Sequence, residues 1–82
     1  MTDAVKDQLI LGRALRTLRE RAGMTQGEVG VRAGTDDTHV SRMERGQFDI
    51  RWHTLRRILA ALDATLADLG DVIDQQDQPP ER

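Results

Sequence analysis

The fold is decided by residues 25–46, which read TQGEVGVRAGTDDTHVSRMERG. Thr25 and Glu28 have the spacing of a capping box, in which a hydroxyl and a carboxylate bond the free amides at the start of a helix. Asp36 is a favourable N-cap for another helix, and Gly34 separates the two because glycine ends helices readily. The stretch therefore predicts two short helices joined by a tight turn.

Small and apolar residues fall where these two helices have to meet. Two short helices that cross at about 90–120° need a small residue at their closest approach, here Gly30, and a turn residue that tolerates a positive φ, here Gly34. Val29, Val40 and Met43 are expected to bind both helices to the core. The outer face of the second helix then stays free, and such a helix can enter the major groove of DNA. The pattern predicts a helix-turn-helix.

The rest of the chain is also predicted to be helical, because its apolar residues repeat with helical spacing and no alternating run predicts a strand. One stripe consists of Leu11, Leu15, Leu18 and Ala22, and another of Trp52, Leu55, Ile58, Leu59 and Leu62. Thr65 and Asp68 form a further box-like cap. We expect an all-α chain, a compact five-helix bundle with helices over about 7–22, 26–33, 36–44, 52–62 and 66–73.

Charge is distributed unevenly along the 82 residues, whose formal net charge is −2. Residues 9–61 carry ten arginines and six acids, a net of +4, whereas residues 62–82 carry six acids and one arginine, a net of −5, and residues 1–8 add −1. Local potential rather than net charge governs the attraction of phosphates, so the acidic end does not exclude a nucleic-acid partner. We expect an N-terminal extension over 1–8, a DNA-binding domain over 9–73 and a flexible acidic tail over 74–82.

Composition argues against several other kinds of protein. There is no cysteine, and apolar runs such as Leu9 to Leu11 are too short for a signal peptide or a membrane span, so we expect a cytoplasmic protein without a membrane partner. His39 and His53 are the only histidines and have no cysteine near them, so no metal or other cofactor is expected. Ser41 and His39 lie two positions apart on one helix and point away from each other, so no enzyme is indicated.

Five pieces of the chain follow one another in a characteristic order. They are LRTLRE (15–20), GMTQ (23–26), VSRMERG (40–46), TLRRILAAL (54–62) and LADL (66–69). Together they resemble the Cro/CI-type (XRE-like) helix-turn-helix regulators over about residues 11–72. The resemblance implies a fold of the lambda-repressor-like DNA-binding domain type. Two positions depart from the usual family pattern: Gly30 stands where alanine is common, and Thr35 where valine or isoleucine is common.

Position by position, the resemblance implies a set of DNA-contacting residues. Those implied to face base edges are Asp37, Thr38 and Arg42, and those implied to hold phosphates are Gln26, Arg45 and the backbone amide of Gly46. His39 and Ser41 border the groove, and either role is open for them. Side-chain chemistry agrees in part, because an arginine binds O6 and N7 of guanine with two hydrogen bonds and a threonine methyl packs against that of thymine. Arg42 is the strongest single candidate.

Two acids at the front of this helix need a separate explanation, because phosphates repel carboxylates. Asp36 is expected to be the N-cap, a position that acids favour. Asp37 either stabilises the helix start or accepts a hydrogen bond from a cytosine amino group. The resemblance also implies a largely buried ion pair between Arg19 and Glu44, which would tie the first helix to the end of the third.

The favoured function is transcriptional regulation, most simply repression, by a homodimer that binds a pseudo-palindromic site on double-stranded DNA. The chain has more apolar residues than so small a core needs, which suggests that some of them form the dimer interface, called the seam below. The candidates are Trp52, Leu66, Leu69, Val72 and Ile73. Trp52 is expected to be a core or interface anchor rather than a ligand platform. Two alternatives stay open: an antitoxin that controls its own operon and also binds a toxin, and a helical adaptor that binds only protein.

Overall fold

The computed structural model describes residues 3–76, which form five α-helices and no strand. The helices are α1 (Asp3–Arg21), α2 (Gln26–Ala33), α3 (Asp37–Glu44), α4 (Trp52–Ala61) and α5 (Leu66–Gln76). The predicted all-α class and the order of its five helices are confirmed. α1 begins earlier than predicted, so residues 3–8 are helical, and α5 continues past residue 74, the predicted start of the tail. Residues 77–82 of that tail lie outside the described residues.

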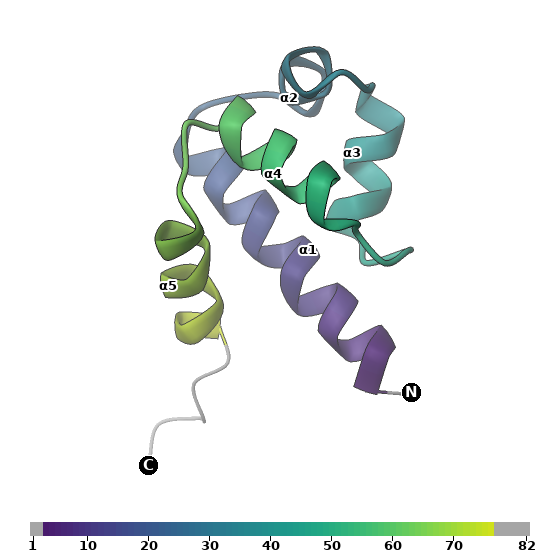
Figure 1. Cartoon of the computed structure of the whole chain (residues 1–82), viewed down its shortest axis with the longest axis vertical. Coiled ribbons are helices and arrows are strands. Elements are labelled where there is room, and N and C mark those ends of the chain that lie inside the picture. Colours follow the sequence, from purple (N-terminus) through teal and green to yellow (C-terminus); the bar gives the residue numbers. More distant parts are fainter. Residues whose placement is uncertain (1–2, 77–82) are drawn as a thin grey trace.

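The helices are arranged around α1, the longest of them (Figure 1). α5 and α3 pack against α1, and α2 packs against both α3 and α4. The core between them is apolar and consists of Ala14, Leu15, Leu18, Val29, Ala33, Val40, Met43, Leu55, Ile58, Leu59, Ala61, Leu62, Leu69 and Val72. Within residues 3–76, no helix is long and apolar enough to cross a membrane.

The predicted caps are present at the starts of three helices. In the capping box of α2, the amide of Glu28 donates to the Thr25 hydroxyl at 3.0 Å, and the amide of Thr25 donates to the Glu28 carboxylate at 2.8 Å. At the start of α3, Asp36 accepts from the amide of residue 39 at 2.8 Å. Thr65 and Asp68 form the same reciprocal pair at the start of α5. The N-cap role predicted for Asp36 is therefore confirmed.

Two glycines allow helices to approach more closely than any side chain would permit. A Cβ at Gly30 would lie 2.6 Å from the carbonyl carbon of Asp36, which confirms that Gly30 marks the close approach of α2 to the start of α3. A Cβ at Gly12 would collide with the carbonyl oxygens of Met43 and Glu44, so α1 passes directly against the end of α3. This second contact could not be predicted from the sequence, because a glycine inside a helix has no spacing signature.

The predicted dimer seam has to be revised, because two of its residues belong to the core of the single chain. Leu69 and Val72 are 4% and 2% exposed and are buried against α1 and its neighbours. Trp52 and Leu66, in contrast, are 57% and 52% exposed. A core position for Trp52 is therefore wrong. Successive residues of a helix are rotated by about 100° around its axis. The buried residues of α4 centre on a side next to that of Trp52, so Trp52 lies at the edge of the apolar stripe.

Candidate nucleic-acid interface

The outer face of α3 is presented to solvent. Thr38 and Arg42 are exposed, and as residues i and i+4 they are neighbours on one face of the helix. On the opposite side, Val40 and Met43 are 3% and 1% exposed and anchor the helix in the core. The structure thus brings Thr38 and Arg42 together on a surface that a major groove can receive.

Asp37 occupies the first turn of α3, beside this face. The residue is exposed, and its carboxylate accepts a long hydrogen bond of 3.5 Å from the Thr38 hydroxyl. The cap of the helix is provided by Asp36, so Asp37 is not needed for that role. A negative charge near a helix N-terminus is still favourable, and the two explanations for Asp37 therefore remain predictions.

A buried polar network fixes α3 to the two preceding helices. Glu44, the last residue of α3, is 7% exposed and accepts hydrogen bonds from Arg19 at 2.6 and 3.0 Å. Gln26 at the start of α2 donates to the same carboxylate at 3.0 Å, and Arg19 also donates to the carbonyl oxygen of Met24 at 2.9 Å. The hydrogen bond with Glu44 raises the pKa of the Arg19 guanidinium above its ordinary value. The ion pair implied by the resemblance is confirmed.

An open depression lies where the start of α2 meets the ends of α1 and α3. Its lining residues are Arg16, Arg19, Gly23, Met24, Thr25, Gln26, Ser41, Glu44 and Arg45. Three residues predicted near DNA, Gln26, Ser41 and Arg45, thus lie around one site. Helix N-termini and arginines both attract phosphate, so the depression is chemically suited to a phosphate group of the DNA backbone. Arg16 has no distinguishing signal in the sequence, because it is one of several exposed arginines on α1.

The geometry argues against the phosphate contact predicted for the amide of Gly46. That amide donates to the carbonyl oxygen of Met43 at 3.0 Å, and Gly46 itself is buried. A Cβ at this position would lie 2.8 Å from the Cα of Leu9, so the backbone is enclosed by α1. An amide has one hydrogen to donate, and in Gly46 it closes the end of α3.

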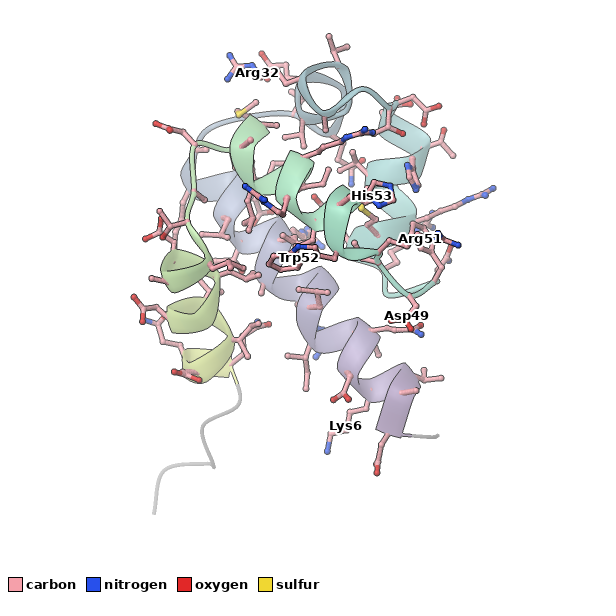
Figure 2. The ribbon with its side chains drawn as sticks, in the orientation of Figure 1. Lys6, Arg32, Asp49, Arg51, Trp52 and His53 are labelled. Carbon is pink, nitrogen blue, oxygen red and sulfur yellow. The ribbon has the colours of Figure 1, made fainter. Side chains whose placement is uncertain are left out.

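His39 lies on a different flank of α3 from Ser41. Its half-buried ring borders a second hollow, next to the loop that connects α3 to α4. Figure 2 shows Asp49, Arg51 and His53 around that loop and the start of α4, whereas Arg32 projects from the side of α2 away from α3. Within residues 3–76, no three histidine, cysteine or acidic side chains are grouped in a way that could hold a metal ion.

Comparisons with known proteins agree with this arrangement. The chain matches the model of a family described as helix-turn-helix domain over residues 10–71, whereas a comparison with curated proteins gives no match. Among solved structures, it is similar to the clp gene regulator ClgR from C. glutamicum, with a TM-score of 0.82 and 26% identity over 89% of this chain and 95% of that chain. It is also similar to the restriction-modification controller protein C.AhdI from Aeromonas hydrophila, with a TM-score of 0.74 and 30% identity over 78% of this chain and 97% of that chain. Since the family match extends from α1 into α5, the chain belongs to the helix-turn-helix domain family, with a Cro/CI-type (XRE-like) arrangement of helices.

Proposed function

We propose that this chain is a cytoplasmic, sequence-specific DNA-binding regulator that represses transcription by binding a pseudo-palindromic operator as a homodimer. The observation that carries the proposal is the outer face of α3, where Thr38 and Arg42 are exposed one turn apart on a helix whose other side is buried. The resemblance to a gene regulator and to a controller protein supports a regulatory role. No catalytic step is part of the proposal.

Within this proposal, different residues recognise the bases and bind the phosphates. Arg42 binds a guanine and Thr38 packs against a thymine methyl, and Asp37 beside them accepts from a cytosine or stabilises the helix start. Around the depression at the start of α2, Gln26 and Arg45 hold phosphates. Gln26 already donates one hydrogen to Glu44, which fixes the direction of its amide group and leaves a second hydrogen for a phosphate oxygen.

The experiment that tests DNA binding is a titration of duplex DNA at several salt concentrations. Neutralising phosphates releases counterions, so the logarithm of the binding constant should fall linearly with the logarithm of the salt concentration. Arg32→Ala is the control, because it removes one positive charge from a residue that projects away from α3 (Figure 2). This variant should retain the affinity of the parent. A protein that binds no duplex at low salt would overturn the proposal and favour a protein-binding adaptor.

Dimerisation is supported by an apolar surface on α4 and α5. A hollow between these helices is lined by Trp52, Arg56, Leu59, Ala60, Ala64, Thr65 and Leu66. Farther along α5, the half-buried residues Gly70 and Ile73 follow Leu66 on the same face. A Cβ built at Gly70 would have no atom within 4 Å apart from those of its chain neighbours and its own helix backbone. We therefore propose Trp52, Leu66, Gly70 and Ile73 as the dimer seam. In the dimer, the two copies of α3, which are the recognition helices, would lie about 34 Å apart. Co-purification of a different protein on this surface would instead favour the antitoxin alternative.

A further inference from the structure

Two contacts on different sides of the ring hold the imidazole of His39 in place. Its Nδ1 atom lies 2.6 Å from the hydroxyl oxygen of Thr35, and its ring stacks on Phe48 with centroids 5.1 Å apart and 20° between the planes. Thr35 lies in the turn before α3, and Phe48 lies in the loop after α3 and packs against the core. The ring is therefore positioned by the segments at both ends of the recognition helix.

These contacts leave the other ring nitrogen, Nε2, available. Among residues 3–76, the Thr35 hydroxyl is the one polar group that bonds the ring, and it bonds Nδ1. His39 borders a hollow that is open to the surface and is lined by Asp36, Thr38, His39, Arg42 and Phe48. Because Thr38 and Arg42 belong to the proposed reading face, DNA on that face would lie next to this hollow.

The Thr35 hydroxyl suits both protonation states of His39. Toward a neutral ring, the hydroxyl donates to Nδ1 when the ring hydrogen is on Nε2, which is the tautomer that a phosphate at Nε2 selects, and it accepts from Nδ1 in the other tautomer. Toward a charged ring, the hydroxyl accepts from the Nδ1 hydrogen, and Nε2 again carries a hydrogen. Beside a phosphate, Nε2 is therefore a donor in both states, and in the charged state its hydrogen bond to the anion is stronger.

We infer that Thr35 and Phe48 are positioning residues that hold Nε2 of His39 toward a phosphate of the DNA backbone. The inference rests on the proposed DNA-binding function and adds a contact whose strength depends on pH. A phosphate is the better partner than a base because the ring is stacked on a loop residue, to the side of the face that carries Thr38 and Arg42. The sugar-phosphate backbone borders a recognition helix on its flanks, whereas base edges lie beneath its outer face.

Charged groups lie on α3, which carries the ring, and on the loop that carries its stacking partner. On α3 and at its N-cap these groups are Arg42, which borders the same hollow, and the Asp36 carboxylate, which accepts from the backbone amide of His39 at 2.8 Å; Asp37 follows Asp36 in the chain. On the loop that carries Phe48 they are Asp49 and Arg51.

The test is the affinity of the full chain for an operator duplex and for a scrambled duplex, measured by fluorescence titration from about pH 5.5 to 8 at constant salt. Affinity of the parent for both duplexes should rise as the pH falls. His39→Gln should lose about tenfold in affinity near pH 6, together with most of the pH dependence. Thr35→Val and Phe48→Leu retain the histidine but should also flatten the pH profile. Thr35→Ser, which keeps the hydroxyl, and His53→Gln should keep the parent's profile.

Three outcomes would overturn the inference while leaving the proposed function intact. The first is a parent-like profile in His39→Gln, which would show that the histidine does not contact DNA. The second is a parent-like profile in Thr35→Val, which would show that the hydroxyl does not position the ring. The third is a loss in His39→Gln on the operator but not on the scrambled duplex, which would mean that the ring contacts a base. Thermal melting confirms that each variant is folded, and failure of the parent itself to bind DNA would overturn the proposed function instead.

Discussion

Arg19 binds both carboxylate oxygens of Glu44, with Nε 2.6 Å from Oε2 and Nη2 3.0 Å from Oε1. The two side chains are 13% and 5% exposed, so water screens this pair little. Arg19 lies near the end of the longest helix and Glu44 ends the recognition helix, while Gln26 of α2 bonds the same carboxylate. One acid therefore sets the position of α3 relative to both helices that precede it.

Removing the Glu44 carboxylate should destabilise the fold. In Glu44→Ala the guanidinium of Arg19 stays largely buried without its partner, and breaking such a pair costs about 3–5 kcal/mol. The matched control is Glu20→Ala, which breaks the exposed pair with Arg16 and should cost well under about 1 kcal/mol. Urea denaturation followed by circular dichroism measures both. Equal midpoints for Glu44→Ala and the parent would show that the pair does not stabilise the fold.

The contact at Gly30 should make alanine unfavourable at that position. Gly30→Ala gains helix propensity, but its methyl group would lie 2.6 Å from the carbonyl carbon of Asp36, and such overpacking costs about 1–3 kcal/mol. Gly27→Ala on the same helix is the control, because its methyl group would meet its nearest atom at 3.8 Å. Thermal melting should show Gly30→Ala below the parent and Gly27→Ala at or above it. A higher melting temperature for Gly30→Ala would contradict the helix packing described above.

The capping box of α2 should make part of the stability depend on pH. The hydrogen bonds with the amide and hydroxyl of Thr25 lower the pKa of the Glu28 carboxyl below its ordinary value of 4.5. Since the pKa of the folded state is the lower one, the carboxylate stabilises the fold above about pH 4.5, and this stabilisation is lost as the pH falls through the folded-state pKa. The difference in denaturation midpoint between the parent and Glu28→Gln should therefore shrink from about pH 6 to pH 3. A constant difference over that range would be inconsistent with the lowered pKa.

The proposed seam predicts that a charge on α5 disrupts dimerisation. Leu66→Glu would place a carboxylate in the apolar seam, whereas Val31→Glu adds the same charge at a residue of α2 that is 79% exposed and remote from α5. Sedimentation at tens of micromolar should show a dimer for the parent and for Val31→Glu, and a monomer for Leu66→Glu. A parent that is strictly monomeric, with and without DNA, would refute the dimer.

Much of the fold could be predicted from the sequence because its signals are local. The three caps and the glycine turn depend on residues only a few positions apart, and these features occur where their spacing predicts them. The ends of the chain were less predictable. α1 starts at Asp3 and α5 runs to Gln76, in segments whose polar residues show no apolar stripe. Residues 3–7 of α1 are exposed, whereas the Gln76 side chain of α5 donates to the carbonyl oxygen of Ile10 at 3.4 Å, a tertiary contact that the sequence does not reveal.

The parts of the site that could not be predicted from the sequence depend on contacts between elements that are distant in the chain. Phe48 stacks on a ring of α3 from the following loop, and Gly12 lies against the end of α3 from another helix. Neither residue belongs to a motif. The amide of Gly46 was predicted for phosphate from its place in the family pattern, but that pattern does not show that Met43 already accepts its hydrogen. Tertiary contacts of this kind determine which candidate atoms are free to bind.

The measurement that tests the central claim most directly compares Arg42→Ala with Arg45→Ala on the operator and on a scrambled duplex at several salt concentrations. Arg42 shares the outer face of α3 with Thr38, whereas Arg45 lies at the helix end, beside the depression proposed to hold a phosphate. Arg42→Ala should lose about 1–3 kcal/mol on the operator and relax the preference at one base pair, while Arg45→Ala should weaken all duplexes alike and reduce the salt slope by about one. Equal losses of affinity in the two variants, on the operator and on the scrambled duplex alike, would contradict the account. In that case α3 would bind DNA without recognising its sequence.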